Sequence, residues 1–174
     1  MTSLISKKGI LATVLFLMIS LFSAPAQDMR ALLGQSLSRL QEPTPEAFLT
    51  CIAELKRIDA MFPDQTAPKY QLALQSLNFA VMNPHSEQTE SLLSEAELTI
   101  GALAQMPASD ASDVCTLWGF LYMTRIVQDP ARNGQRYYLD VIQNYEKALK
   151  ANPDNALAKQ LQEKFNEGMA QAMR

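Results

Sequence analysis

The chain has 174 residues, a formal net charge of −3 and an apolar content of 48%. This apolar content is enough for a folded core, and the lack of clustered Lys and Arg argues against a nucleic-acid partner, which needs a basic patch. Six glycines and many Ala, Leu, Gln, Glu and Met residues favour helices.

The first part of the chain has the pattern of a secretory signal. Lys7-Lys8 precede an apolar run over 10–22, and Ala24-Pro25-Ala26 supplies small residues where a signal peptidase cuts. We predict a signal peptide over residues 1–26 and export to the periplasm or the medium. A membrane anchor is the alternative, but the run is about 13 residues long and a spanning helix needs about 20.

The exported part, residues 27–174, has the size of one domain. Loss of the two leader lysines leaves 13 basic against 18 acidic residues, a net charge of about −5. We expect no membrane span in this part after cleavage.

Apolar residues at helical spacing predict seven helices in this domain and no strand. The expected segments are 29–41, 45–61, 67–82, 87–105, 111–128, 136–151 and 154–172. Pro63, Pro107 and Pro153 each follow a helix, at spacings of 44 and 46 residues. This recurrence predicts stacked helical hairpins, and the single apolar stripe of the last helix is typical of a cap.

The third pair of helices resembles a tetratricopeptide repeat (TPR). The first helix has Trp118-Gly119 and Tyr122, and the second has Val141, Tyr145, Ala148 and Pro153 at spacings of four, three and five. The resemblance implies that Gly119 and Ala148 let the two helices approach closely, while Tyr122 and Tyr145 fill the space beside them. The first pair matches this pattern in part, and the second pair is degenerate.

The resemblance implies an all-α fold of antiparallel hairpins, stacked as a short α-solenoid with a C-terminal capping helix. A standard repeat has 34 residues, but the stretch 128–136, QDPARNGQR, lengthens the turn inside the third hairpin. Asp129-Pro130 and Asn133-Gly134 are turn-forming pairs, so a loop is expected there. This layout is similar to small exported TPR-like proteins of Gram-negative bacteria.

Peptides commonly bind in the hollow face of TPR proteins. If Trp118 and Tyr122 point inward, the residues that face this hollow are Thr116, Phe120, Met123 and Thr124. Phe120 and Met123 are then either contacts for a partner or packing against a neighbouring helix. The positions where one TPR subtype grips a terminal carboxylate carry Asp113, Thr116 and Phe120, so that clamp is not expected.

The long insert carries a small basic and aromatic group, Arg132, Arg136 and Tyr137. It is either a solvated loop or a docking loop, since loops on a rigid scaffold often carry recognition.

The sequence predicts no catalytic site, no metal site and no cofactor. His85 is the only histidine, and Cys51 and Cys115 are expected as buried free thiols, with a disulfide as the alternative. The scattered carboxylates are expected on solvent-exposed helix faces and at helix starts, where negative charge is favoured. They are Glu87, Glu90, Glu95, Glu97, Asp110 and Asp113. Gly-rich phosphate loops and nucleophile motifs do not occur.

These observations favour a non-enzymatic periplasmic module that binds a protein or peptide partner. One alternative is a small-ligand-binding protein or enzyme with a pocket under the 128–137 insert; a deep polar pocket with two or more converging ionisable groups would favour it. Another is a structural subunit that associates with itself through apolar faces.

Overall fold

A computed structural model describes residues 26–172 of the chain. The described part is helical, without a strand, which confirms the predicted helical class. Residues 26–38 form a helix that continues into a short 3-10 turn, η1 (Arg39–Gln41). The others are α2 (Pro45–Met61), α3 (Thr66–Met82), α4 (Thr89–Ala104), α5 (Ala111–Gln128), α6 (Pro130–Ala151) and α7 (Ala156–Ala172). The predicted leader falls on residues 1–25, outside the described residues, and on Ala26.

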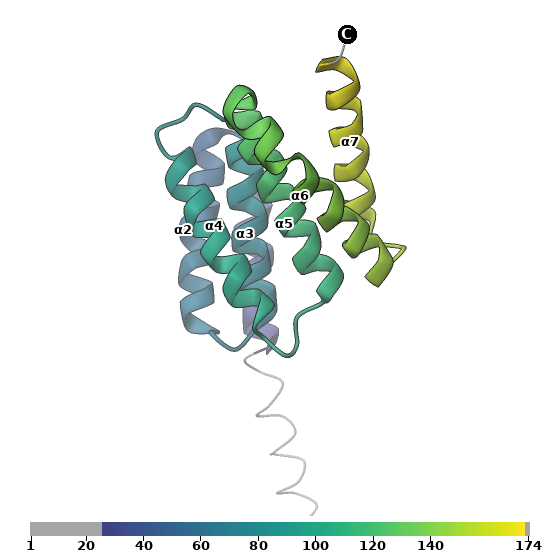
Figure 1. The fold of residues 1–174 in the computed structure, drawn as a ribbon. Helices are drawn as coiled ribbons and strands as arrows, with labels where there is room; N and C mark the ends of the chain where they lie inside the picture. Colours follow the sequence, from purple (N-terminus) through teal and green to yellow (C-terminus); the bar gives the residue numbers. More distant parts are fainter. Residues whose placement is uncertain (1–25, 173–174) are drawn as a thin grey trace, which may run out of the picture.

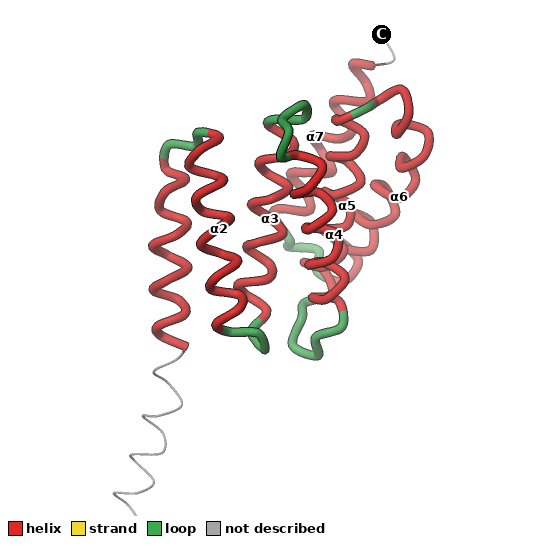
Figure 2. Tube along the Cα trace, turned by 90° about the vertical axis from the view of Figure 1, so that its left-hand side faces the viewer, coloured by secondary structure: helices red, strands yellow, loops and turns green. Residues whose placement is uncertain are grey.

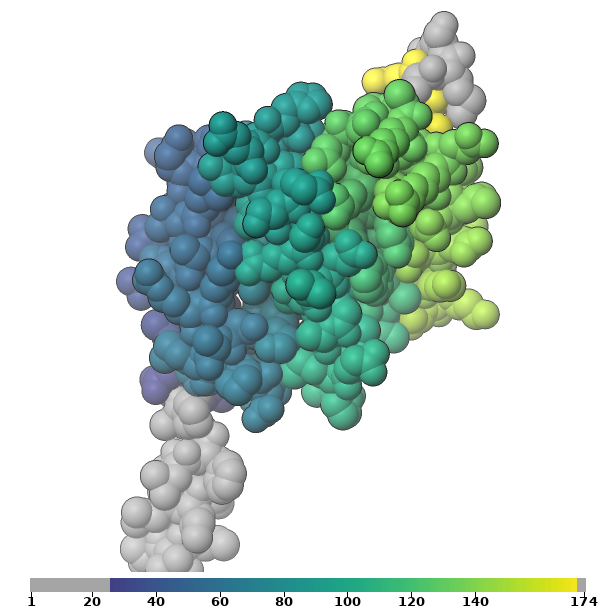
Figure 3. Space-filling view, turned by 60° about the vertical axis from the view of Figure 1, so that its left-hand side comes forward, coloured from purple at the N-terminus to yellow at the C-terminus, as the bar shows by residue number. Residues whose placement is uncertain are grey.

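The helices lie side by side in the order of the chain. Connecting turns alternate between the two ends of the row (Figure 2), and the colours of the space-filling view pass from one side of the molecule to the other in sequence order (Figure 3). Each helix contacts the next one, and α3 also contacts α5, as α5 contacts α7. The most extensive contact joins α5 to α6. The helix α5 is therefore packed from several sides.

The helix starts follow from short-range capping chemistry. Thr44 Oγ1 accepts a hydrogen bond from the Ala47 N–H at 3.1 Å, and Pro45 occupies the first turn. Asp110 Oδ1 accepts from the Asp113 N–H at 3.0 Å. Such caps stabilise a helix by about 1 kcal/mol each, because they satisfy amide groups that have no partner inside the helix. Thr44 and Asp110 are thus the N-caps of α2 and α5.

The predicted loop over 128–136 is wrong, because these residues begin a helix. Asp129 alone separates α5 from α6, and its carboxylate accepts from the Arg132 N–H at 3.1 Å. Pro130 follows at the first helical position, where its missing N–H costs nothing. Asn133 Nδ2 donates to the Arg125 carbonyl at 2.7 Å, which satisfies an acceptor in the last turn of α5. Asp129-Pro130 thus begins α6, and Asn133 of the second predicted turn pair satisfies a carbonyl at the end of α5.

Two apolar clusters form the core. The N-terminal cluster is built mainly from α2 and α3 and is centred on Leu55 and Phe79. The C-terminal cluster takes residues from every helix between α3 and α7 and is centred on Leu117 and Tyr145. Both cysteines are free, Cys51 buried in α2 and Cys115 half-buried in α5. Burial raises the pKa of both thiols, so they stay protonated at neutral pH.

Gly119 sets how closely α5 and α6 pack. A Cβ atom at this position would lie 2.6 Å from Cε1 of Tyr145, whose side chain is fully buried. Val141 and Ala148 are also fully buried on the same face of α6. Pro153 is exposed in the turn between α6 and α7. The absent side chain of Gly119 therefore makes room for the ring of Tyr145.

Candidate functional site

The four residues predicted to line a hollow face are inside the core. Thr116 and Thr124 are 0% exposed, Phe120 is 2% exposed and Met123 is 8% exposed. The two threonine hydroxyls donate to carbonyls of their own helix, at 2.7 and 2.8 Å. Of the two alternatives for Phe120 and Met123, the structure has packing against neighbouring helices and no accessible groove, because α3 and α7 pack over this side of α5. Of the four, Met123 lines a pocket.

That pocket, here called the apolar pocket, is a hollow of about 480 Å³ open to solvent. Four helices form it, with nearly all of its wall apolar. Its lining residues are Val81 of α3, Met123, Ile126 and Val127 of α5, Pro130 and Gly134 of α6, and Lys164, Phe165, Gly168 and Met169 of α7. Figure 1 shows the end of the molecule where α5 ends, α6 begins and α7 runs to its C-terminal end.

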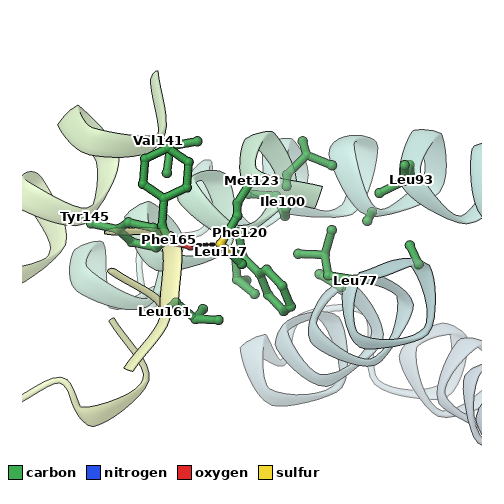
Figure 4. Close-up of a cluster of buried hydrophobic side chains, with 14 of the residues drawn as sticks. Leu77, Leu93, Ile100, Leu117, Phe120, Met123, Val141, Tyr145, Leu161 and Phe165 are labelled. Atoms are coloured by element: carbon green, nitrogen blue, oxygen red, sulfur yellow. Dashed lines mark hydrogen bonds between the residues drawn. The ribbon is translucent and has the colours of Figure 1, made fainter. Parts of the chain in front are cut away.

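The helix α7 supplies one wall of the apolar pocket. Leu161 and Phe165 of α7 belong to the same buried cluster as Met123 and Phe120 of α5, and Figure 4 draws the Phe165 ring beside Val141 of α6. The Phe165 ring lies 5.8 Å from the ring of Tyr138, centre to centre, which anchors α7 to α6. Polar anchoring of α7 comes from Asn155, whose side-chain amide donates to Ser112 Oγ of α5 at 2.9 Å. Phe165 is thus held at the inner edge of the hollow.

Tyr145 orients the sulfur of Met123 at the base of the pocket. The Tyr145 hydroxyl donates to Met123 Sδ across 3.8 Å, the dashed line in Figure 4. Burial raises the pKa of Tyr145, so the phenol remains a neutral donor over the physiological range. The thioether is therefore held by a fixed partner.

A second hollow, here called the arginine pocket, lies on the other side of the α5–α6 junction. Its volume is about 530 Å³, and its wall is mostly polar. The lining residues are Glu90, Arg125, Gln128, Asp129, Arg132, Asn133, Arg136 and Tyr137. Five of these side chains are charged: Glu90, Arg125, Asp129, Arg132 and Arg136.

Two side chains of α5, Arg125 and Gln128, bind the Glu90 carboxylate in this hollow. Arg125 Nη1 donates to both of its oxygens at 2.7 and 2.8 Å, and Gln128 Nε2 donates to one at 3.1 Å. The other terminal nitrogen of Arg125 lies 3.6 Å from Glu97. The hydrogen bond from Arg125 is the main reason why the pKa of Glu90 is lowered.

A row of stacked rings leads to the arginine pocket. Trp118 stacks on Tyr122 with ring centres 5.8 Å apart, and Tyr122 stacks on Tyr137 at 5.4 Å. The Arg136 guanidinium lies 4.9 Å from the centre of the Tyr137 ring. The predicted docking residues Arg132, Arg136 and Tyr137 are therefore on the first turns of a helix and not on a loop.

Sequence reasoning missed two contributors. Glu90 and Arg125 are 35 residues apart, and no local pattern predicts their pairing. The sequence predicts a capping helix with one apolar stripe, whereas Phe165 and Met169 of that stripe line the apolar pocket. Apolar residues recur at the same sequence spacing whether they pack in a core or line a pocket, so the sequence pattern of α7 does not distinguish the two.

Within 26–172 there is no group of three or more His, Cys, Asp or Glu side chains placed to hold a metal ion. No helix of the described part is long and apolar enough to cross a bilayer. His85 lies in the turn between α3 and α4, outside both pockets.

No family model matches the chain, and no curated protein matches it. Among solved structures, the chain is similar to the HusA haemophore from Porphyromonas gingivalis, with a TM-score of 0.68 and 24% sequence identity. The match covers 78% of this chain and 66% of the haemophore chain, just under two thirds of that protein. At this identity the likeness shows a shared helical fold.

Proposed function

We propose that this chain is a non-enzymatic binding protein that takes a flat, largely apolar small molecule in the apolar pocket. One observation carries the proposal: four helices leave a solvent-open hollow of about 480 Å³ with nearly all of its wall apolar. Ligand pockets are typically about 300–1,000 Å³, lined mainly by apolar side chains with a few polar groups. Lys164 is the charged group at this one.

A porphyrin is the ligand class that we propose to test first. The similar solved structure is that of a haemophore, and a porphyrin combines an apolar ring with carboxylates at one edge. The apolar wall would receive the ring, and the Lys164 ammonium would pair with a carboxylate. The lining contains no histidine, and the Met123 thioether already accepts from Tyr145. We therefore expect ring burial, more than iron ligation, to supply the affinity.

The test compares haem with metal-free protoporphyrin, titrated into the purified protein and followed by absorbance and porphyrin fluorescence. Gly134→Leu and Gly168→Leu each add a side chain at the pocket wall. A Cβ at either glycine meets nothing within 4 Å, and leucine favours helix over glycine by roughly 0.5–1 kcal/mol. Folding should therefore survive while binding weakens by about tenfold or more.

Gly101→Leu is the matched control. It lies in α4, also meets nothing within 4 Å, and is outside the apolar pocket. Equal affinities for all four proteins, or no saturable binding of either porphyrin, would reject the proposal. If the metal-free ring binds as tightly as haem, the ring is the recognised part.

A peptide is the second candidate occupant, because an open apolar hollow between helices also receives the apolar face of a partner helix. A peptide ligand would agree with the predicted protein-binding function. Its binding site would be the apolar pocket and not the predicted groove, whose residues are buried. Crosslinking in the cell envelope with wild type and Gly168→Leu separates the two. A single protein captured by the wild type and lost in the variant favours the peptide.

We also infer a TPR-like α-solenoid, with α7 as its cap. Two observations support it. The helix α3 contacts α5, and α5 contacts α7. The helices within each expected hairpin, α3 with α4 and α5 with α6, pack more extensively than α4 and α5, which belong to different hairpins. Contacts between neighbours and next neighbours are typical of stacked repeats.

Export to the periplasm follows from the predicted signal over residues 1–26. N-terminal sequencing of the protein from the periplasmic fraction should give Gln27 as the first residue. Protein that keeps Met1 and stays in the cytoplasm would overturn this part.

A further inference from the structure

We propose that the arginine pocket is a second binding site, for the phosphate or carboxylate group of a small polar molecule. It is separate from the apolar pocket, since the two hollows share no lining residue. The inference does not depend on what the apolar pocket binds.

The charges in the hollow are unevenly paired. Arg125 is neutralised by Glu90 at 2.7 Å and by Glu97 at 3.6 Å. Arg132 and Arg136 take part in none of the ion pairs found among residues 26–172. Four residues apart on α6, they are neighbours on one helix face, where like charges repel. An anion held between the two guanidinium groups would remove that repulsion.

The surrounding residues prepare the hollow for an anion. The carboxylate of Glu90 is held by Arg125 and Gln128, so its charge is largely balanced before a ligand arrives. Asp129 is the opposing charge, and it caps the amide of Arg132.

The aromatic row fixes one edge of the site. Tyr137 is stacked on Tyr122, so the Tyr137 ring has a defined position. Arg136 lies over that ring at 4.9 Å, which limits where its guanidinium moves. A guanidinium placed in this way offers paired N–H donors that match two oxygens of a carboxylate or phosphate.

The size of the hollow indicates more than a lone ion. Its volume of about 530 Å³ leaves room beside the anionic group, and the remaining wall is polar. A polyol or sugar carrying phosphate or carboxylate groups fits this chemistry, since its hydroxyls can donate to the side-chain amide oxygens of Gln128 and Asn133, whose amide nitrogens are already bound.

The test is calorimetric titration of the purified protein with pyrophosphate and with citrate at low ionic strength. We expect at least one probe to bind with a Kd in the millimolar range or tighter, and more weakly as salt is added. Arg132→Gln together with Arg136→Gln should weaken binding by about tenfold or more. Comparison of the two probes shows whether phosphate or carboxylate is preferred.

The matched control is Arg30→Gln together with Arg57→Gln, which changes the net charge equally at exposed positions outside the hollow. Equal weakening in both double variants, or no binding of either probe, would overturn the proposal. Gly168→Leu should bind the probes as the wild type does, so failure of one pocket does not imply failure of the other.

Discussion

Replacement of Gly119 by alanine tests the close approach of α5 and α6. The added Cβ would lie 2.6 Å from Cε1, 2.8 Å from Cδ1 and 3.1 Å from Cζ of Tyr145. Carbon atoms pack at about 3.5–4.0 Å, so either the ring or the helix must move. The Tyr145 ring is fully buried and its hydroxyl is bound to Met123. The ring therefore has no free space to enter.

Two opposing effects set the magnitude. Overpacking of a dense core costs typically 1–3 kcal/mol, whereas alanine favours a helix over glycine by about 0.8–1.0 kcal/mol. The added Cβ clashes with three atoms of the Tyr145 ring, and moving the ring breaks its hydrogen bond to Met123. We therefore expect the overpacking cost to be about 3 kcal/mol, the upper end of that range. The net loss in the free energy of unfolding should be about 1–2 kcal/mol. Urea denaturation followed by circular dichroism measures it.

Gly101→Ala is the control, because a Cβ there meets nothing within 4 Å. It should raise the free energy of unfolding by up to about 1 kcal/mol. The double variant Gly119→Ala with Tyr145→Leu should lose less than the sum of the single losses, because the smaller side chain relieves the clash. If Gly119→Ala stabilises the protein as much as Gly101→Ala does, the packing argument is refuted.

Three further outcomes are expected. Ser76→Ala should leave the free energy of unfolding unchanged or raise it by about 1 kcal/mol in urea titrations, because this buried hydroxyl has no hydrogen-bond partner within the described structure. Asn155→Ala should cost about 1–3 kcal/mol and lower hydrogen-exchange protection in α7 first; Asn155 caps α7 at Ala158 and donates to Ser112 of α5 at 2.9 Å. Wild-type protection in that variant would contradict the anchoring role. The lowered pKa of Glu90 means that its ion pair stabilises the fold above the ordinary Glu pKa and is lost as the pH falls through the folded value. Its exposure limits the effect to below about 1 kcal/mol, and Arg125→Gln should flatten the acid limb of a pH–stability curve; an unchanged limb would show that the pair contributes nothing.

Helix number and most boundaries were predictable because each depends on nearby residues. The 3.6-residue spacing of apolar side chains marks a helix, and Thr44 before Pro45 marks its start. The same logic failed at Asp129-Pro130, since this pair starts a helix as readily as it makes a turn. The choice depends on whether the following turns find a neighbour to pack on, which α5 provides.

The burial of α5 was less accessible to sequence reasoning, although one signal existed. Residues 114–127 are apolar on almost every side of the helix, which is typical of a helix enclosed by others. The sequence predicts one packed face and one binding face for this helix and places Phe120 and Thr124 on the binding face, whereas both side chains are buried. The two pockets depend on helices far apart in the chain, as with Glu90 and Arg125, and only their arrangement in space reveals them.

The most direct test of ligand binding is a titration of isotope-labelled protein with metal-free protoporphyrin, observed by amide NMR. The porphyrin ring current shifts nearby nuclei strongly, so the largest saturable changes mark the binding place. We predict them at Met123, Gly134, Phe165 and Gly168, with α2 little affected. Saturable shifts centred on another part of the chain, or none at all, would contradict binding in the apolar pocket.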